Sequence, residues 1–134
     1  MAGKLVVNVD GGSRGNPGPA AVAAVASTPD GEIVAEHGER IGEATNNVAE
    51  YRAVLLGIEL ARELGASEIE LVGDSELIVH QLRGDYKVKQ GHLRPLHASA
   101  LKGLMDFDGW SIRHVGREHN AEADRLVNEA LDGA

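Results

Sequence analysis

Two short apolar segments, each ending at or just before an aspartate, lie on either side of one long predicted amphipathic helix. Residues 4–10 read KLVVNVD, with apolar side chains on both alternating faces, and residues 68–73 read EIELVG directly before Asp74. A strand that is apolar on both faces belongs in the middle of a sheet. Strands that are linked through a helix, here over residues 47–64, become parallel neighbours by a right-handed crossover. We therefore expect Asp10 and Asp74 at the carboxyl ends of adjacent parallel strands, where open α/β sheets bind ligands.

The segment that separates the first strand from the helix predicts a β-meander. Residues 10–19, DGGSRGNPGP, are rich in glycine and proline and indicate a turn. The alanine content of residues 20–27 would also suit a helix. Pro19 before this segment and the sequence PDG at 29–31 after it favour strands at 20–27 and 32–41 instead.

The remaining elements follow from periodicity and from residues typical of helix ends. Gly65 is expected to end the long helix in a left-handed conformation, and Asn120 is expected to cap the last helix. Further helices are predicted at 75–82, 92–105 and 120–132, and a last strand at 110–115. The order βββαβααβα predicts an α/β fold with a five-stranded mixed sheet, in which a meander of three strands and two parallel strands are flanked by helices. We expect one domain over residues 1–134.

Composition limits the compartment and the ligands. The chain contains no cysteine, so disulfides and thiolate metal sites are excluded. Because no apolar run reaches the roughly 18 residues of a membrane span and no signal peptide is evident, we expect a cytoplasmic monomer without membrane contact. The formal net charge of −8 argues against a polyanionic partner. Two Mg²⁺ ions bound by acidic residues would reduce that charge to about −4 and reverse its sign locally.

Two further acids occupy the apolar faces of predicted helices. Glu50 shares a face with small residues of the long helix, and Asp124 shares one with apolar residues of the last helix. Local explanations exist for each: Asn47 and Glu50 have the spacing of a capping box, and Asp124 suits the positive end of a helix dipole. A single aspartate such as Asp10 or Asp74 also commonly caps a turn.

Taken together, four carboxylates directed at the interior call for bound cations, because their charges would otherwise be buried unpaired. Oxygen ligands without cysteine select Mg²⁺ or Mn²⁺ rather than zinc. Two such ions could activate a water and stabilise the leaving oxygen of a phosphodiester. The pattern therefore predicts a metal-dependent phosphodiester hydrolase that needs no covalent intermediate.

Four blocks of the sequence resemble, in order and spacing, those of the type 1 ribonuclease H family: DGGSRGNPGPA at 10–20, TNNVAEYRAVLLGIELA at 45–61, GDSELIVHQL at 73–82 and VGREHNAEADRLV at 115–127. The resemblance implies a ribonuclease H-like fold. It also implies hydrolysis of the RNA strand of RNA–DNA hybrids with two Mg²⁺ ions, leaving 5′-phosphate and 3′-hydroxyl ends. Its four metal-binding acids fall on Asp10, Glu50, Asp74 and Asp124.

The same resemblance suggests residues that bind substrate and transfer protons. The family's contacts to the RNA strand fall on Gly11, Gly12, Ser13, Asn16, Asn46 and Asn47. Asparagine suits a 2′-hydroxyl because it offers both a donor and an acceptor, although all six residues could simply form turns. The family's mobile histidine before the last acid corresponds to His119 rather than His114, which lies within the predicted strand. A surface histidine without a role is the alternative.

One departure from many bacterial relatives concerns a basic helical handle that grips the DNA strand. This chain has only RGDYKVKQGHLRPL at 83–96 in its place. A modest basic and stacking surface remains possible there, from Arg83, Tyr86, Lys87, Lys89 and Arg94. Trp110 is expected to pack instead. We therefore expect weaker and strongly salt-sensitive binding of hybrids.

Other functions of related folds fit the sequence less well. Proofreading exonucleases carry an Asp-x-Glu pair on the first strand, whereas Asp10 is followed here by Gly11 and Gly12. Actin-like ATPases need two such domains to enclose a nucleotide. A non-catalytic module that binds hybrids is the remaining alternative, and the intact set of four acids argues against it.

Overall fold

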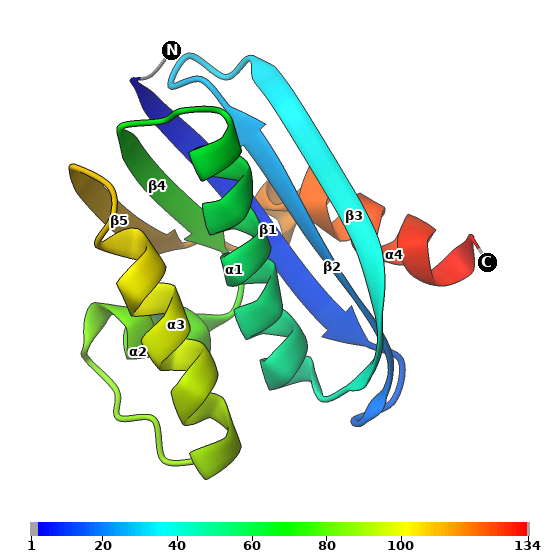
Figure 1. Cartoon of the computed structure of the whole chain (residues 1–134). Helices are drawn as coiled ribbons and strands as arrows, with labels where there is room; N and C mark the ends of the chain where they lie inside the picture. Colours follow the sequence, from blue (N-terminus) through cyan, green and yellow to red (C-terminus); the bar gives the residue numbers. More distant parts are fainter. Residues whose placement is uncertain (1–2, 134) are drawn as a thin grey trace.

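A five-stranded mixed sheet with the order β3-β2-β1-β4-β5 lies at the centre of the computed structural model, which describes residues 3–133 (Figure 1). The strands are β1 Lys4–Ser13, β2 Gly18–Ser27, β3 Ile33–Ala44, β4 Glu68–Gly73 and β5 Gly109–His114. The helices are α1 Asn46–Glu63, α2 Glu76–Arg83, α3 Arg94–Leu104 and α4 Ala121–Asp132, with short 3-10 helices η1 Gly91–Leu93 and η2 Arg117–His119.

Strand pairing confirms the predicted fold. β1 and β2 pair antiparallel, as do β2 and β3, whereas β1 pairs parallel with β4 and β4 parallel with β5. The strand at 20–27 is confirmed over the alternative helix. β1 is the central strand, as its apolar character on both faces predicts.

Helices cover both faces of the sheet. α1 and α3 lie on one face, and α4 lies on the other, across β2 and β3 (Figure 1). Gly57 lets α1 approach the sheet, because a Cβ atom there would lie only 2.7 Å from Cγ1 of Val9. On the opposite face, Ala123 and Val127 of α4 pack against small residues of β2, including Ala23. The two faces therefore bring α1 and α4 to opposite sides of β1.

The predicted turn at 10–19 is wrong in its first part. β1 continues through Ser13, and Asp10 pairs with Ala23 inside the β1–β2 ladder, so Asp10 does not end the strand. The turn is confined to residues 14–17 between the two strands. Main-chain hydrogen bonds to a long partner strand outweigh the weak strand preference of glycine. For the same reason β3 extends to Ala44, beyond the predicted end.

The ends of the helices correct two further interpretations. Thr45 caps α1, since its Oγ1 accepts a hydrogen bond from the Val48 N–H at 3.2 Å, so the proposed capping box of Asn47 and Glu50 is wrong. Gly65 follows α1 with φ +75°, as predicted. Asn120 occupies the N-cap position of α4, but its side chain makes no capping bond.

Two smaller predictions concern the third helix and the packing of Trp110. The helix predicted at 92–105 is divided into η1 and α3. Trp110 packs against the main core, as expected.

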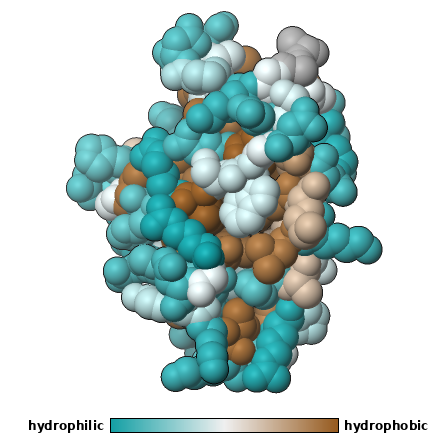
Figure 2. All heavy atoms as spheres, turned by 90° about the vertical axis from the view of Figure 1, so that its left-hand side faces the viewer, coloured by the Kyte–Doolittle hydropathy of each residue, from teal (hydrophilic) through white to brown (hydrophobic). Residues whose placement is uncertain are grey.

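The side of the molecule that carries β5, α2 and α3 shows apolar atoms between hydrophilic ones (Figure 2). Within residues 3–133 no helix has the length and apolar character needed to cross a membrane.

Candidate active site

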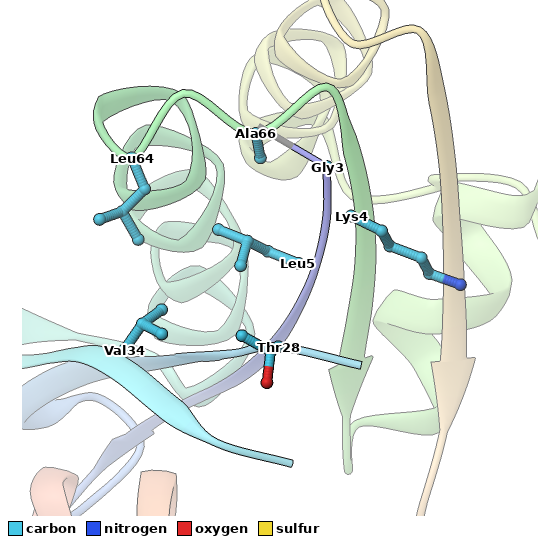
Figure 3. Close-up of a pocket in the computed structure, with 7 residues that line it drawn as sticks. All are labelled: Gly3, Lys4, Leu5, Thr28, Val34, Leu64 and Ala66. Carbon is cyan, nitrogen blue, oxygen red and sulfur yellow. The ribbon is translucent and has the colours of Figure 1, made fainter. Parts of the chain in front are cut away.

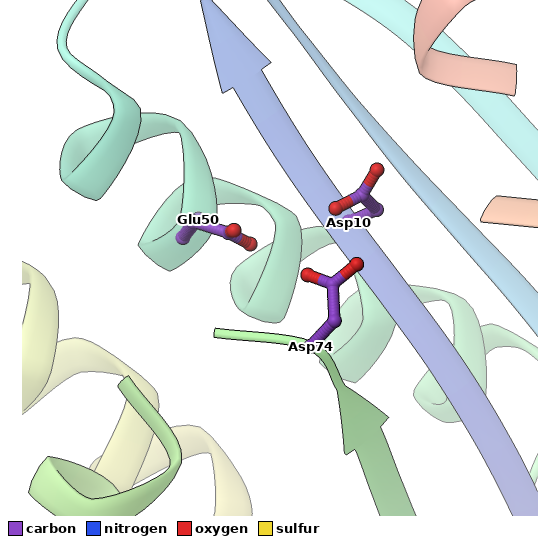
Figure 4. A group of neighbouring side chains, drawn as sticks. All are labelled: Asp10, Glu50 and Asp74. Carbon is purple, nitrogen blue, oxygen red and sulfur yellow. The ribbon is translucent and has the colours of Figure 1, made fainter. Parts of the chain in front are cut away.

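Three carboxylates from distant parts of the chain converge beside the sheet. Asp10 on β1, Glu50 on α1 and Asp74 after β4 each offer one oxygen, and these oxygens lie within 4.8 Å of one another. Figure 4 shows the three side chains directed toward a common point. The group could hold a metal ion, because hard divalent cations bind carboxylate oxygens.

Strand register explains the proximity of Asp10 and Asp74. The parallel ladder between β1 and β4 ends where Asn8 pairs with Val72. Asp10 and Asp74 each lie two residues beyond this last pair, so the same register brings them side by side. The prediction that both aspartates meet is confirmed, although Asp10 lies within its strand.

Glu50 reaches the aspartates because α1 lies very close to β1. A Cβ atom on Gly11 would lie 2.2 Å from the carbonyl oxygen of Ala49, so only glycine fits there. The Gly11 N–H donates a hydrogen bond to Oε1 of Glu50 at 3.2 Å. This bond fixes the carboxylate against the strand that carries Asp10, and it replaces the local helix cap that the spacing from Asn47 suggested.

Burial and mutual repulsion raise the pKa of Asp10 and of Glu50 in the absence of a cation. Asp10 is only 6% exposed. Its burial, followed by the charges of Asp74 and Asp124, raises the pKa of Asp10 to about 8. Burial is also the main reason that the pKa of Glu50 lies well above its ordinary value, and Asp10 and Asp74 add to that shift. A divalent cation would relieve both effects, so the donor set fits such an ion.

Asp124 borders the same cleft but lies outside the close group of three. The cleft has a volume of about 490 Å³, and Asp124, Val127 and Leu131 line it from α4. Asp124 lies in the first turn of that helix. Its predicted alignment with the two apolar residues is therefore confirmed, and its charge is close enough to raise the pKa of Asp10.

Most of the residues predicted to contact RNA lie at one end of this cleft. Gly11, Gly12, Ser13 and Asn46 line it. Oδ1 of Asn46 accepts a hydrogen bond from the Ser13 N–H at 2.9 Å, and Oδ1 of Asn16 accepts one from the Asn46 N–H at 3.0 Å. The turn after β1 is thereby tied to the start of α1. The residues at 11–13 belong to β1, so the alternative that they are turn formers is wrong for them.

Asn16, Asn47 and both histidines lie away from the lining of the cleft. Asn16 contacts the cleft residue Asn46, whose N–H donates to its Oδ1, and Asn47 is partly buried in α1. The side chain of His119 is 73% exposed and borders a different hollow, together with Asn120. His114 is exposed at the end of β5. A role for His119 in proton transfer stays a prediction.

Arg117 is a residue of the cleft that the sequence analysis missed. It lines the cleft beside the acids, and its positive charge lowers the pKa of both Asp10 and Glu50. The signal in the sequence was a cation two residues before His119, in the block GREHN. A single arginine near a helix start is common, and only the fold brings this one to residues on β1 and α1.

The predicted basic and stacking surface is only partly present. Tyr86 is 46% exposed, and Lys87 and Lys89 line a pocket of about 460 Å³ with it. By contrast, Nε of Arg83 donates to the Ile112 carbonyl at 3.0 Å, and Nε of Arg94 donates to the Val88 carbonyl at 3.1 Å. The two arginines are thus held by the protein's own backbone. The two lysines and the tyrosine are the groups better placed for a partner.

A further hollow lies at the other end of the sheet and has a different character. Its volume is about 330 Å³, and apolar side chains of Leu5, Val34 and Leu64 face one another across it (Figure 3). Lys4 points away from the other lining side chains (Figure 3). Its Nζ lies 3.2 Å from Oε1 of Glu70. Among the described residues that line the hollow, none carries a carboxylate or an imidazole. It is therefore not an alternative metal site to the cluster of Asp10, Glu50 and Asp74.

Comparison with known proteins gives matches over nearly the whole chain. A family model described as reverse transcriptase-like matches residues 8–130. Ribonuclease HI of Halobacterium salinarum is 50% identical, over 98% of this chain and 66% of that protein. A protein of Mycobacterium tuberculosis described as bifunctional is 46% identical, over 98% of this chain and 36% of that protein. The chain therefore spans only part of the length of both relatives.

Solved structures agree with these matches. The structure of RNase H1 from Halobacterium salinarum has a TM-score of 0.96 and 50% identity, and the match covers 98% of this chain and 99% of that one. The structure of LC11-RNase H1 in complex with an RNA/DNA hybrid has a TM-score of 0.92 and 41% identity, covering 96% and 97% of the two chains.

Proposed function

The chain belongs to the ribonuclease H family, and from that premise we propose that it hydrolyses the RNA strand of RNA–DNA hybrids, leaving 5′-phosphate and 3′-hydroxyl ends. One observation carries the proposal: three carboxylate oxygens of Asp10, Glu50 and Asp74 lie within 4.8 Å of one another beside an open cleft. The relative that is similar over almost its full length and holds an RNA/DNA hybrid supports the substrate.

We propose Mg²⁺ as the cofactor, in two ions, with Mn²⁺ as a substitute. Asp10, Glu50 and Asp74 would hold the metal most directly, and Asp124 would complete the second site from the opposite side of the cleft. When bound, the ions lower the pKa of a water molecule and stabilise charge on the phosphate oxygens. The all-oxygen donor set supports magnesium or manganese over softer metals.

The chain's own residues prepare the site for this chemistry. The Gly11 N–H fixes Glu50, so the carboxylate does not need to reorganise during the reaction. Arg117 supplies a positive charge that favours the ionised form of Asp10 and Glu50. Its position in the cleft also suits an approaching phosphate.

Asn46 is the best placed of the proposed contacts to RNA. Its Oδ1 is used by Ser13. Its Nδ2 has no hydrogen-bond partner in the described part of the chain, which leaves two donors for a 2′-hydroxyl. Gly11, by contrast, has its N–H engaged by Glu50, so its contribution is to let α1 approach β1. We keep Gly12, Asn16, Asn47 and His119 as proposals from the family resemblance.

A cleavage assay tests the function against the alternative of a non-catalytic module that binds hybrids. The protein is incubated with a labelled RNA–DNA hybrid and Mg²⁺, with and without EDTA, and with single-stranded RNA and duplex DNA as comparison substrates. We expect cleavage of the RNA strand of the hybrid that EDTA abolishes. Asp10→Asn and Asp74→Asn should be inactive. Binding without cleavage by the unaltered protein would favour the alternative, and full activity of either variant would reject the metal assignment.

Three expectations from the sequence stay predictions: a single domain over residues 1–134, a monomeric state and a cytoplasmic location. Sedimentation of the purified protein tests the monomer, since a dimer would double the measured mass.

A further inference from the structure

The amides of Asn8, which is partly buried, and Asn120, which is fully buried, form a hydrogen-bonded pair on the face of the sheet that α4 covers. Nδ2 of Asn8 donates to Oδ1 of Asn120 at 3.0 Å, across 112 residues of sequence. Nδ2 of Asn120 donates to the Val9 carbonyl at 2.9 Å. Asn120 is only 1% exposed. Buried amides are costly unless they are paired, so both bonds favour one position of the chain before α4.

The bond to Val9 lies where two strands of the sheet separate. The β1–β4 ladder ends at the pair of Asn8 and Val72, so the Val9 carbonyl lies just beyond the last paired residues. Asn120 supplies the hydrogen bond that this carbonyl needs. Asp10 is the next residue along β1. The contact is therefore one residue away from Asp10, which belongs to the cluster of three carboxylates.

The backbone of Asn120 joins this contact to both charged residues that α4 and η2 bring to the cleft. Its N–H donates to the Arg117 carbonyl at 3.0 Å, and its carbonyl accepts from the Asp124 N–H at 3.1 Å. Arg117 and Asp124 both line the cleft. A shift of Asn120 along β1 would carry both of them with it.

Apolar packing alone would not fix this position. α4 rests on β2 through Ala123 and Val127, and the β2 surface beneath it includes the small residues Ala21 and Ala23. Contact with small side chains sets the distance between the layers but gives little resistance to sliding. Polar contacts such as the exposed ion pair of Arg125 and Glu36 also join α4 to the sheet, but they hold side chains in solvent. Hydrogen bonds are directional, so the pair formed with the buried Asn120 adds a constraint at the start of α4 that this packing does not supply. The side chain of Asn120 has no role as a helix cap that would explain its burial otherwise.

We propose that Asn120, braced by Asn8, is a positioning residue that holds the start of α4 in register with β1 and so places Asp124 and Arg117 against the acid group. This inference deepens the proposed function and rests on it. Asn120 itself does not line the cleft. Its effect passes through Asp124 and Arg117.

The test compares Asn120→Ala with Ile69→Val, a control at the distant start of β4 where Ile69 is 1% exposed. Both changes remove buried contacts and should lower the melting temperature. We expect Asn120→Ala to lower kcat at saturating Mg²⁺ by about tenfold or more with KM for the hybrid changed by less than about threefold, because misplaced catalytic groups slow the chemical step. Ile69→Val should leave both constants unchanged. Unchanged kcat in Asn120→Ala, or an equal loss in Ile69→Val, would overturn the proposal.

A combined variant tests the path of the effect. Because Asn120 is proposed to act through Asp124 and Arg117, adding Asn120→Ala to a protein that already carries Asp124→Asn and Arg117→Ala should lower kcat by less than about threefold further, whereas independent roles would multiply. Multiplied losses would therefore overturn the proposal. Asn8→Ala keeps the bond to Val9, and we expect a smaller loss in kcat with KM again unchanged. It serves as the deciding variant if Asn120→Ala does not fold, and an unaltered kcat there would overturn the proposal.

Hydrogen exchange of the metal-free proteins gives a readout that does not depend on activity. Asn120→Ala should speed exchange over residues 117–124 and leave β4 unchanged, whereas Ile69→Val should not affect 117–124. Unchanged exchange at 117–124 in Asn120→Ala would overturn the positioning role. Absence of cleavage by the unaltered protein would instead reject the proposed function, and the exchange comparison would still decide whether Asn120 holds α4.

Discussion

Replacing Asp10 by asparagine should stabilise the metal-free protein while abolishing its response to magnesium. In the folded chain the pKa of Asp10 is raised from 3.8 to about 8, chiefly by burial and then by Asp74 and Asp124. A group whose pKa is raised on folding contributes stability that is complete below its unfolded pKa and is lost as the pH rises through its folded pKa. The metal-free protein has therefore lost this contribution by pH 8, and asparagine, which does not ionise, avoids the loss.

The magnitude follows from the size of the shift. A difference of about four pKa units, at ~1.4 kcal/mol each, gives an upper limit on the order of 5 kcal/mol for this group. Asparagine removes the charge but keeps a buried polar side chain, so we expect about 1–2 kcal/mol of that at pH 8. For a domain of this size that corresponds to a melting temperature raised by roughly 4–8 °C.

Thermal unfolding followed by circular dichroism measures the effect in EDTA at pH 8 and at about pH 4, and again with MgCl₂ at pH 8. Asp108→Asn is the matched control because Asp108 is exposed, and it should change the free energy of unfolding by less than about 0.5 kcal/mol. We expect Asp10→Asn to gain stability at pH 8 but not near pH 4, and magnesium to stabilise the unaltered protein and Asp108→Asn but not Asp10→Asn. A gain that is equal at both pH values, or a loss at pH 8, would refute the electrostatic reasoning.

Three further predictions follow from contacts elsewhere in the structure. Gly11→Ala should destabilise the protein by about 3 kcal/mol or more, as measured by urea unfolding, because its Cβ would lie 2.2 Å from the Ala49 carbonyl oxygen. Gly12→Ala is the control, since its Cβ meets only Cγ1 of Val127 at 3.9 Å, and an equal effect of the two changes would contradict the packing argument. Tyr51→Phe should cost about 1–2 kcal/mol because it leaves Oε1 of the buried Gln81, which accepts from the Tyr51 hydroxyl at 2.6 Å, without its donor. Tyr86→Phe at the surface should change the unfolding free energy by less than about 0.5 kcal/mol, and a loss equal to that of Tyr51→Phe would argue against the buried bond. Hybrid binding by the inactive Asp74→Asn protein should weaken steeply with salt, and removing Lys87 and Lys89 together should reduce the slope of log K against log salt by about 1–2, whereas Lys102→Ala should not. Affinity that does not change with salt would show that phosphate contacts contribute little.

The sequence was sufficient for the topology and for the three acids that meet. Alternating apolar residues in 4–10 identified a central strand, and the helix at 47–64 implied the parallel crossover that brings Asp74 beside Asp10. These inferences succeeded because burial imposes a period on the sequence, and a period can be read locally. The strand ends were less predictable, since β1 continues through Gly11 and Gly12 only because β2 is there to pair with them.

The two predictions of helix caps, at Glu50 and at Asn120, failed for one physical reason, which is competition between a local and a distant hydrogen-bond partner. Glu50 has the spacing of a capping residue, yet its carboxylate accepts from Gly11, 39 residues away. Asn120 stands at the position of a helix cap, yet its amide donates to Val9, 111 residues away. A side chain can take either partner, and the choice depends on which backbone groups the folded sheet leaves unpaired nearby. In both cases the distant partner, Gly11 or Val9, lies on β1 next to Asp10, so each of these polar side chains ties its own segment to the strand that carries the site.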